Sequence, residues 1–344
     1  MFMKYPLIFG ITVLFFLGCK QASNTASNSF SKVIIKSIIE DSLLNIRALE
    51  IDKHTLKAVS SIGDTYTYDT KSAQILIDRV SGDTLNFRSS AILENAYFTL
   101  SIGSPAYLFK DKELVYEETH PAAFYDALHF WNSKEGLAIG DPTDGCMSVV
   151  VTRDGGLTWK KIACESLPPA VQGEAAFAAS DTNIAIVGDE AWIATGGLSS
   201  RVLYSPDKGY NWEVFETPII QGEETTGIFS IDFYDALNGF AIGGDYTKPK
   251  SQHSNKIRTN DGGKTWELVA QDQSPGYRSC VQYVPNSNAM GLVAVGFEGV
   301  DYSHDGGNTW VSLSDEGFYS IRFLNDSVAY TAGKGKLCKL SFIK

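Results

Sequence analysis

The chain has 344 residues, of which 44% are hydrophobic, 20% are charged and 31 are glycine. This profile is typical of a turn-rich all-β protein, and the length is sufficient for one large domain with a buried core. A formal net charge of −11 argues against a basic binding surface, so we expect neither a nucleic-acid partner nor direct binding to anionic lipid.

Residues 1–18 have the pattern of a secretory signal, with Lys4 ahead of an apolar run over 6–17 that is too short for a membrane span. The phrase Phe-Leu-Gly-Cys at 16–19 resembles a bacterial lipobox, apart from phenylalanine in place of the usual leucine. The resemblance implies that Cys19 becomes the lipidated first residue. An ordinary signal peptide cleaved nearby is the alternative.

Residues 19–31 are rich in serine, asparagine, threonine and alanine, which predicts a flexible tether after the lipidated cysteine. We therefore expect a signal peptide over 1–18, the lipidated cysteine and tether over 19–31, and one domain over 32–344. The expected location is the cell envelope, on an outer membrane that the protein meets through its lipid alone. Whether the domain faces the periplasm or the exterior stays open.

A pair of short apolar strands recurs along the domain. The first strands of these pairs are predicted at 124–130, 173–178, 228–233 and 277–283, and the second strands at 136–140, 191–195, 239–243 and 292–296. The same pair recurs over 46–59, 85–102 and 318–332. An apolar segment at 31–39 precedes the first pair and predicts one further strand.

An octet with the frame [ST]-x-D-x-G-x-[TN]-W follows four of these pairs. Its aspartates and tryptophans are Asp154 and Trp159, Asp207 and Trp212, Asp261 and Trp266, and Asp305 and Trp310, with the aspartates 44 to 54 residues apart. The hydroxyl, aspartate and glycine positions favour a hairpin turn, and the spacing is typical of a radial β-repeat. The octet resembles the Asp box, or bacterial neuraminidase repeat, of β-propellers. The resemblance implies a structural role at the blade edge rather than chemistry.

Two strands before each octet and two around it make a four-stranded antiparallel blade. We therefore predict an all-β, seven-bladed β-propeller. Six blades is the alternative count, because 61–80 is hard to divide. The last unit lacks an outer strand, which the segment at 31–39 is expected to supply, so that the ring closes without an exposed edge.

The order of phrases from Asn45 to Leu340, including 138–142, 173–177, 243–246, 276–279 and 315–318, resembles bacterial relatives of the photosystem II stability and assembly factor family. That family belongs among the WD40, YVTN and BNR-like repeat propellers, so the resemblance implies the fold. Its members often carry an oxidoreductase label. The sequence has no dinucleotide-binding loop and no flavin or haem motif, so we expect no cofactor and do not transfer that activity.

The cysteines and histidines give few chemical signals. Cys146 and Cys164 flank the first octet almost symmetrically, and such positions face each other in an antiparallel pair, so a disulfide and two free thiols are both open. Cys280 and Cys338 lie in apolar strands and are expected in the core. The five histidines lack metal-ligand spacing, so we predict no metal site.

Three arginines stand where predicted innermost strands begin: Arg47, Arg88 and Arg278. We hypothesise that they converge on an anion at one end of the central channel, because guanidinium groups bind carboxylate and phosphate bidentately. This arrangement resembles the arginine triad of sialidases. Local ion pairs for each arginine are the alternative.

Four carboxylates are candidates to complete such a site. Asp126 and Glu174 stand at strand entries, and Asp141 and Asp245 follow second strands, where organising a tight loop is the alternative role. Trp131, Trp192 and Tyr246 are candidates to stack on sugars, with blade packing as the alternative. No residue is identified as catalytic.

Two functions are open. The first is a monomeric, lipid-anchored envelope propeller that acts as a non-enzymatic binding or assembly scaffold for a protein partner or a glycan. The second is a sialidase-like glycoside hydrolase that uses the arginines as an anion clamp. The scaffold is preferred because the sequence contains no recognisable catalytic set.

Overall fold

The computed structural model describes residues 1–3, 29–94 and 96–344. Most of the predicted signal peptide, the lipidation site Cys19 and most of the tether fall within 4–28, outside the described residues. Over the described part of the chain, no helix has both the length and the apolar character needed to span a bilayer.

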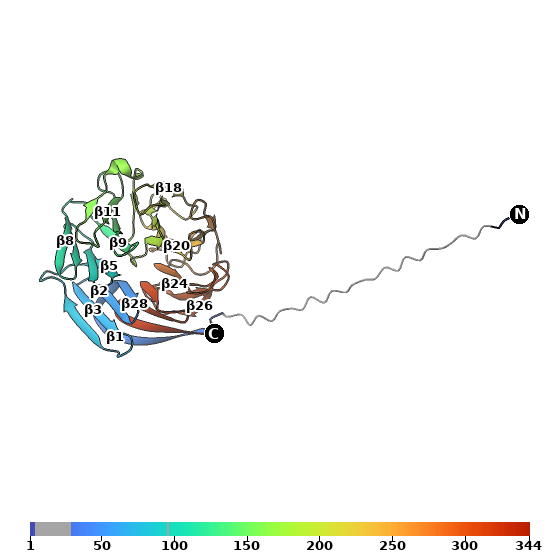
Figure 1. Cartoon of the computed structure of the whole chain (residues 1–344). Helices are drawn as coiled ribbons and strands as arrows, with labels where there is room; N and C mark the ends of the chain where they lie inside the picture. The colour runs from blue at the N-terminus through green and yellow to red at the C-terminus, as the bar shows by residue number, and fades with distance from the viewer. Residues whose placement is uncertain (4–28, 95) are drawn as a thin grey trace.

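The strands form six antiparallel sheets arranged around a central axis (Figure 1). Four sheets are four-stranded and run, from the innermost strand outward, in chain order. They are β5 (Phe87–Leu93), β6 (Ala96–Ser101), β7 (Ala106–Lys110) and β8 (Glu113–Glu118); β9 (Tyr125–Phe130), β10 (Gly136–Gly140), β11 (Ser148–Thr152) and β12 (Lys160–Lys161); β14 (Ile184–Val187), β15 (Glu190–Ala194), β17 (Arg201–Ser205) and β18 (Glu213–Glu216); and β23 (Cys280–Tyr283), β24 (Leu292–Gly296), β25 (Gly299–Ser303) and β26 (Val311–Ser314).

Two sheets are six-stranded. One has the order β13 (Glu174–Ala175), β16 (Gly196–Gly197), β19 (Thr226–Phe233), β20 (Gly239–Asp245), β21 (Lys256–Thr259) and β22 (Glu267–Leu268). The other has the order β27 (Ser320–Phe323), β28 (Val328–Ile343), β1 (Lys32–Asp52), β2 (Thr55–Ser60), β3 (Asp64–Asp69) and β4 (Ile75–Arg79). A short 3-10 helix, η1 (Cys164–Ser166), follows β12.

The long strand β1 closes the ring. Its first part pairs with β28 from Lys32 opposite Ile343 to Asn45 opposite Lys334, and its last part pairs with β2 from Ile46 to Asp52. The N-terminal strand therefore supplies the outer strand of the last unit, as predicted, and covers its edge.

Counted by sheets, the protein is a six-bladed all-β propeller, which is the alternative count of the sequence analysis. The preferred count of seven separate blades is not matched, because β1 hydrogen-bonds to both β28 and β2 and so joins the first and last predicted units. Around the axis the innermost strands neighbour one another in the order β1, β5, β9, β14, β19, β23, β27 and back to β1. The joined sheet thus contributes both β1 and β27 to the channel wall.

The apolar core lies between neighbouring sheets rather than at one centre. One cluster combines Leu137 and Ile139 of β10 with Ile193 of β15 and Leu203 of β17. Every residue of β10 is buried, because a sheet in the ring packs on both of its faces. The second strands therefore read as continuous apolar runs rather than as alternating ones.

All four octets form the same hydrogen-bonded turn. In the third copy the Thr259 hydroxyl accepts the Gly263 amide at 2.9 Å, and the Asp261 carboxylate accepts the Thr265 amide at 2.9 Å and its hydroxyl at 2.6 Å. Gly263 has φ of +83°, which favours glycine, and a Cβ there would lie 3.0 Å from the Trp192 ring. Each octet thus holds its own turn and packs against the preceding sheet.

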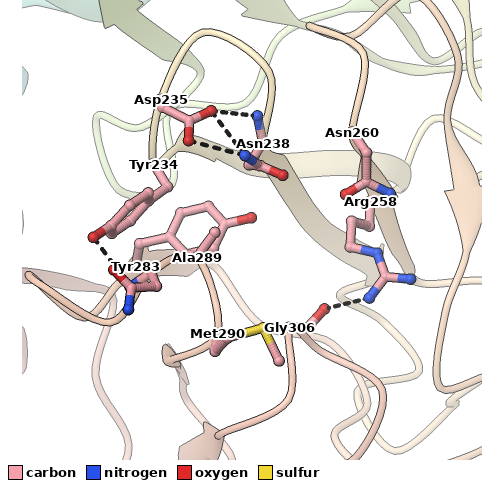
Figure 2. A pocket seen from close by; sticks show the side chains of 10 residues that line it. Tyr234, Asp235, Asn238, Arg258, Asn260, Tyr283, Ala289, Met290 and Gly306 are labelled. Carbon is pink, nitrogen blue, oxygen red and sulfur yellow. Dashed lines mark hydrogen bonds between the residues drawn. The ribbon is translucent and has the colours of Figure 1, made fainter.

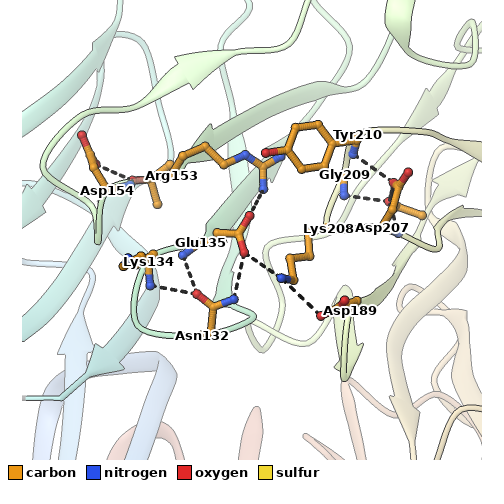
Figure 3. Close-up of polar contacts among 12 residues, drawn as sticks. Asn132, Lys134, Glu135, Arg153, Asp154, Asp189, Asp207, Lys208, Gly209 and Tyr210 are labelled. Atoms are coloured by element: carbon orange, nitrogen blue, oxygen red, sulfur yellow. Dashed lines mark hydrogen bonds and ion pairs between the residues drawn. The ribbon is translucent and has the colours of Figure 1, made fainter.

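Polar contacts also join neighbouring sheets beside the octets (Figure 3). Glu135, between β9 and β10, accepts hydrogen bonds from Lys208 of the second octet at 2.8 Å and from Arg153 of the first at 3.2 Å. The Arg153 guanidinium also lies 4.2 Å from the centre of the Tyr210 ring. Although burial alone would raise it, these contacts lower the pKa of Glu135, so it is ionised at neutral pH.

Cys146 and Cys164 form a disulfide, which decides between the two states that the sequence left open. Cys164 lies in η1, beyond the end of β12, so the bond extends the hairpin past its last paired residues. Cys280 and Cys338 are buried free thiols, as predicted.

We expect Asp261→Ala to lower the free energy of unfolding by about 2 kcal/mol, because its carboxylate holds the octet turn through several hydrogen bonds. Urea titration followed by tryptophan fluorescence measures the change. The matched control is Asp315→Ala, whose carboxylate has no hydrogen bond among the described residues. Equal stability of the two variants would contradict a role for the aspartate in the turn.

Candidate functional site

The central channel is filled by the segment 176–183, which we call the channel segment. It follows β13 and contacts innermost strands on different sides of the axis. The Asp181 carboxylate accepts the Ser90 amide of β5 at 2.8 Å and the Leu128 amide of β9 at 3.1 Å. The Ser180 hydroxyl donates to the Ser279 carbonyl beside β23 at 2.6 Å, and the Ile231 amide of β19 donates to the Thr182 carbonyl at 2.9 Å.

The channel segment forms the floor of a cavity of about 610 Å³. The charged side chains that line it are Arg47, Arg88, Asp141 and Glu224. Residues 175–179 form its floor. The remaining walls are aromatic, from Phe124, Phe229, Tyr246, Tyr277, Phe297 and Tyr319. We call this the arginine pocket, and the side of the propeller that it opens on the pocket face.

The octets lie on the opposite face. The Gly155, Gly262 and Gly306 amides of three octets donate to carbonyls in the hairpins that follow innermost strands, at Lys134, Leu237 and Met290. The arginine pocket instead lies where the innermost strands begin, as with Phe124 just before β9. The two faces are thus at opposite ends of the same strands.

Arg47 and Arg88 are the two predicted arginines that line the pocket. Arg47 donates to the Ala179 carbonyl at 3.3 Å and Arg88 to the Ala178 carbonyl at 3.4 Å. Both Nε atoms are buried without a hydrogen-bond partner, and neither guanidinium has a carboxylate within ion-pair distance among the described residues. Burial, and then the charge of Arg47, lower the pKa of Arg88 to about 10. Two close positive charges with no carboxylate at ion-pair distance among the described residues suit an anionic ligand, although the nearby Asp126 partly offsets the charge of Arg88.

Arg278 does not line the pocket. Its Nε and Nη2 contact Asp301 of β25 at 2.6 and 2.5 Å, and Nη1 donates to the Tyr277 carbonyl. Both side chains of this ion pair are buried. The expected convergence of three arginines is therefore met by two, and for Arg278 the alternative of a local ion pair holds, because Asp301 arrives from the neighbouring hairpin.

Of the four candidate carboxylates, Asp141 lines the pocket and Asp126 is buried close to it. Asp141 accepts the Ala176 amide at 2.8 Å, and burial raises its pKa to about 6. Asp126 is fully buried near Arg88 and Asp141, and its carboxylate has no well-formed hydrogen bond in the described structure. Burial, and then the charge of Asp141, raise the pKa of Asp126 well above its usual value, whereas Arg88 opposes the rise.

The other two carboxylates have structural partners. Glu174 is buried against Arg201, with Nη2 to Oε2 at 2.6 Å. Asp245 binds the Thr247 amide and hydroxyl and Lys248, and these contacts hold its pKa at about 2 although burial alone would raise it. For Asp245 the alternative role of organising a tight loop agrees with these contacts.

The aromatic walls were mostly missed by the sequence analysis. Tyr246 was a candidate and lines the pocket, whereas Trp192 is fully buried and packs on Phe233. Phe177 stacks on Phe229 with ring centroids 3.8 Å apart, and Arg47 lies 4.1 Å from the Tyr319 ring centroid. An aromatic residue near the start of several innermost strands, at Phe124, Phe229, Tyr277 and Tyr319, is the sequence signal that would have found this wall.

Metal ligation has no support in the described structure, where no group of three histidine, cysteine or acidic side chains is placed to hold an ion. The site consists of Arg47, Arg88, aromatic rings and the two carboxylates Asp141 and Glu224.

Comparisons with known proteins agree on the fold. No protein-family model matches the sequence, and no curated protein matches it. The solved structure of "YCF48 bound to D1 peptide" has a TM-score of 0.65 at 13% identity, covering 92% of this chain and 96% of that one. YCF48 from Cyanidioschyzon merolae has a TM-score of 0.65 at 10% identity, covering 89% and 98%. The RRP9 WD40 repeats have a TM-score of 0.62 at 11% identity, covering 90% and 97%.

The chain is thus similar in fold to YCF48 and to WD40 propellers. This supports the predicted resemblance at the level of the propeller. At these identities the likeness shows the fold alone, because one fold carries many functions.

We expect Arg278→Met to lower the free energy of unfolding by about 3 to 5 kcal/mol, because it leaves Asp301 buried without its partner. The double variant Arg278→Met/Asp301→Leu should recover most of the loss. Urea midpoints of the three proteins test this. A single variant as stable as the wild type would show that the ion pair has no structural role.

The raised pKa of Asp141 predicts that the stability of the wild type, compared with an Asp141→Asn variant, depends on pH. Its pKa is about 6 in the folded chain against an ordinary value of 3.8, so its ionisation destabilises the fold increasingly as pH rises from about 4 to about 6. Asp141→Asn keeps an acceptor for the Ala176 amide and removes the charge. Over this range the free energy of unfolding of the variant should rise relative to that of the wild type by at most about 3 kcal/mol. The difference should then stay constant to pH 7. Urea unfolding at several pH values measures the gain, and a difference independent of pH would contradict the raised pKa.

Proposed function

We propose that the protein is a non-enzymatic binding or assembly scaffold that holds an acidic segment of a protein partner in the arginine pocket. The observation that carries the proposal is the pair Arg47 and Arg88, which line the cavity with no carboxylate at ion-pair distance among the described residues. A scaffold needs such a preformed site rather than a reacting group.

The chemistry of the pocket favours a peptide with an acidic side chain or a terminal carboxylate. A carboxylate between the two guanidinium groups would replace hydrogen bonds that the chain itself leaves unmade. The aromatic rings beside it suit an apolar neighbouring side chain. A cavity of about 610 Å³ falls within the usual range for a small bound group.

The overall charge strengthens the selectivity of this pocket. At a net charge of −11, most of the surface repels an acidic partner, so an anionic segment is favoured only where the unpaired arginines lie. One of the similar propellers, YCF48, has been solved bound to a D1 peptide. The shared fold lends support to a peptide ligand here, but we do not transfer the D1 peptide itself to this chain.

The sialidase-like hydrolase is the less favoured function. That hypothesis relied on three converging arginines, and Arg278 is engaged by Asp301 away from the pocket. The raised pKa values of Asp126 and Asp141 are the only feature of the described residues that favours acid chemistry there. Buried carboxyls with raised pKa values also occur without catalysis.

We further propose that the protein acts in the cell envelope, as an outer-membrane lipoprotein anchored through Cys19. The lipobox-like phrase at 16–19 and the disulfide between Cys146 and Cys164 support this, since disulfides persist in oxidising compartments. The four octets are Asp boxes in this proposal, as their shared turn supports.

Peptide binding tests the function. Fluorescence anisotropy with labelled peptides that combine acidic and aromatic residues should detect binding to the domain over 29–344 in the wild-type protein. Arg47→Gln/Arg88→Gln should weaken it by about tenfold or more, because two charge-assisted contacts are lost. The matched control is Arg79→Gln, which removes an exposed ion pair with Asp64 on outer strands.

Two outcomes would contradict the scaffold. Equal peptide affinity of the double variant and the wild type would exclude the arginine pocket as the binding site. Release of sugar from sialosides by the wild type, lost in the double variant, would establish the hydrolase instead.

A further inference from the structure

A second cavity lies on the octet face, between the sheets that contain β19 and β23 (Figure 2). It has a volume of about 310 Å³. Its walls come from the hairpins after those two strands, at 234–238 and 288–290, and from Arg258, Asn260 and Gly306 of β21 and the octets. We call it the tyrosine pocket, after Tyr234 and Tyr283.

The tyrosine pocket and the arginine pocket are at opposite ends of the same strands. Phe229 and Tyr277 line the arginine pocket, whereas Tyr234 and Tyr283 line the tyrosine pocket. Five or six residues of extended chain separate the members of each pair, roughly 17 to 20 Å. One ligand the size of either cavity therefore does not fill both.

Tyr283 is the central polar group of the tyrosine pocket. Its side chain is only 7% exposed, and its hydroxyl has no hydrogen-bond partner in the part of the chain that the structure describes. In Figure 2 the hydroxyl points into the space in front of Arg258 and Asn260. The Tyr283 amide donates to Asp232 at 2.7 Å, which holds the end of β23 in place. The hydroxyl opens onto the cavity without a partner among the described residues, so a ligand there can form a hydrogen bond with it.

Other polar groups of the pocket are also neutral and unused. The side chains of Asn260 and Asn288 make no hydrogen bond with the described residues. The backbone amide of Asn288 donates to the Tyr234 hydroxyl at 3.0 Å. The side-chain amides offer donors and acceptors together, as the tyrosine hydroxyls do. This mixture suits a ligand whose own groups both donate and accept.

The charged side chains at the tyrosine pocket already have polar partners. Arg258 contacts Glu267 at 2.6 Å and donates to the Gly306 carbonyl at 3.1 Å, and both oxygens of Asp235 accept from Asn238. An anionic ligand therefore gains no unpaired cation here, in contrast to the arginine pocket. The rings of Tyr234 and Tyr283, with Met290, add an apolar surface beside the amides.

We infer that the tyrosine pocket binds a neutral sugar unit of a glycan. A sugar offers hydroxyl groups that donate hydrogen bonds to the Asn260, Asn288 and Tyr283 side chains and accept hydrogen bonds from them. Its C–H faces pack on the tyrosine rings and Met290. The protein then has two binding sites of different chemistry, an anion site on the pocket face and a neutral sugar site on the octet face. This inference does not depend on the peptide-binding function.

Saturation-transfer NMR with a panel of free saccharides tests the inference on the domain over 29–344. The probes are glucose, galactose, mannose, N-acetylglucosamine and their common disaccharides, each up to about 10 mM, a concentration that detects millimolar dissociation constants. At least one neutral sugar should receive saturation from the wild-type protein. Sialyllactose distinguishes the sites, because its carboxylate directs it to the arginine pocket.

Tyr283→Phe and Asn260→Ala should each weaken binding of that sugar by about tenfold, since each removes groups that hydrogen-bond the ligand. His304→Ala is the matched control, because His304 occupies the same octet position as Asn260 and lies outside the tyrosine pocket. Tyr283→Phe removes a hydroxyl that no described residue uses, so the fold is retained, and thermal unfolding checks this.

The two binding proposals fail separately. Arg47→Gln/Arg88→Gln should leave sugar binding unchanged, and Tyr283→Phe should leave peptide binding unchanged. The inference is overturned if no neutral saccharide binds, if binding survives both Tyr283→Phe and Asn260→Ala, or if only the peptide probes respond to these substitutions.

Discussion

The contact of Asp181 with the walls of the channel is the interaction on which the arrangement of the binding surfaces depends. Its carboxylate, 3% exposed, accepts amides from β5 and β9, and its backbone carbonyl accepts a hydrogen bond from Arg322 of β27. Burial, and then the charge of Glu50, raise the pKa of Asp181 well above its usual value, whereas Arg322 and the two amides oppose the rise. One residue in the channel thus ties together strands that are remote in the sequence.

The channel segment turns an open pore into a closed pocket. Because it fills the axis, a ligand on the pocket face meets the carbonyls of Ala178 and Ala179 rather than a water-filled passage. Those same carbonyls accept from Arg88 and Arg47 and so orient both guanidinium groups. The floor and the anion-binding groups are therefore positioned by one stretch of chain, which provides a preorganised site of the kind that lowers the entropic cost of binding.

Stability and binding are divided between different parts of each unit. The octets hold their turns with local hydrogen bonds and pack a glycine against the preceding sheet, as Gly307 does on Phe240 of β20. The starts of the innermost strands take no part in the octet turns. Arginines and aromatic rings are found there. The hairpins on the octet face contribute the tyrosine pocket, because two of them, after β19 and β23, stand beside each other with polar tips.

The sequence by itself determined the elements with local or repeated signals. Four octets, most of the paired apolar strands and the N-terminal closing strand were predicted, because turn chemistry and strand patterning act over a few residues. The innermost strand predicted at 173–178 was wrong, because only Glu174–Ala175 is a strand there and β14 (Ile184–Val187) pairs with β15 instead. Arg47 and Arg88 were found from their position before innermost strands. Tertiary structure alone decided that β1 joins two units into one sheet, since a 21-residue strand with two partners has no signature distinct from two strands. It also decided that Arg278 pairs with Asp301, that 176–183 fills the channel and that Tyr283 lacks a partner among the described residues, because each depends on residues that only the closed ring brings together.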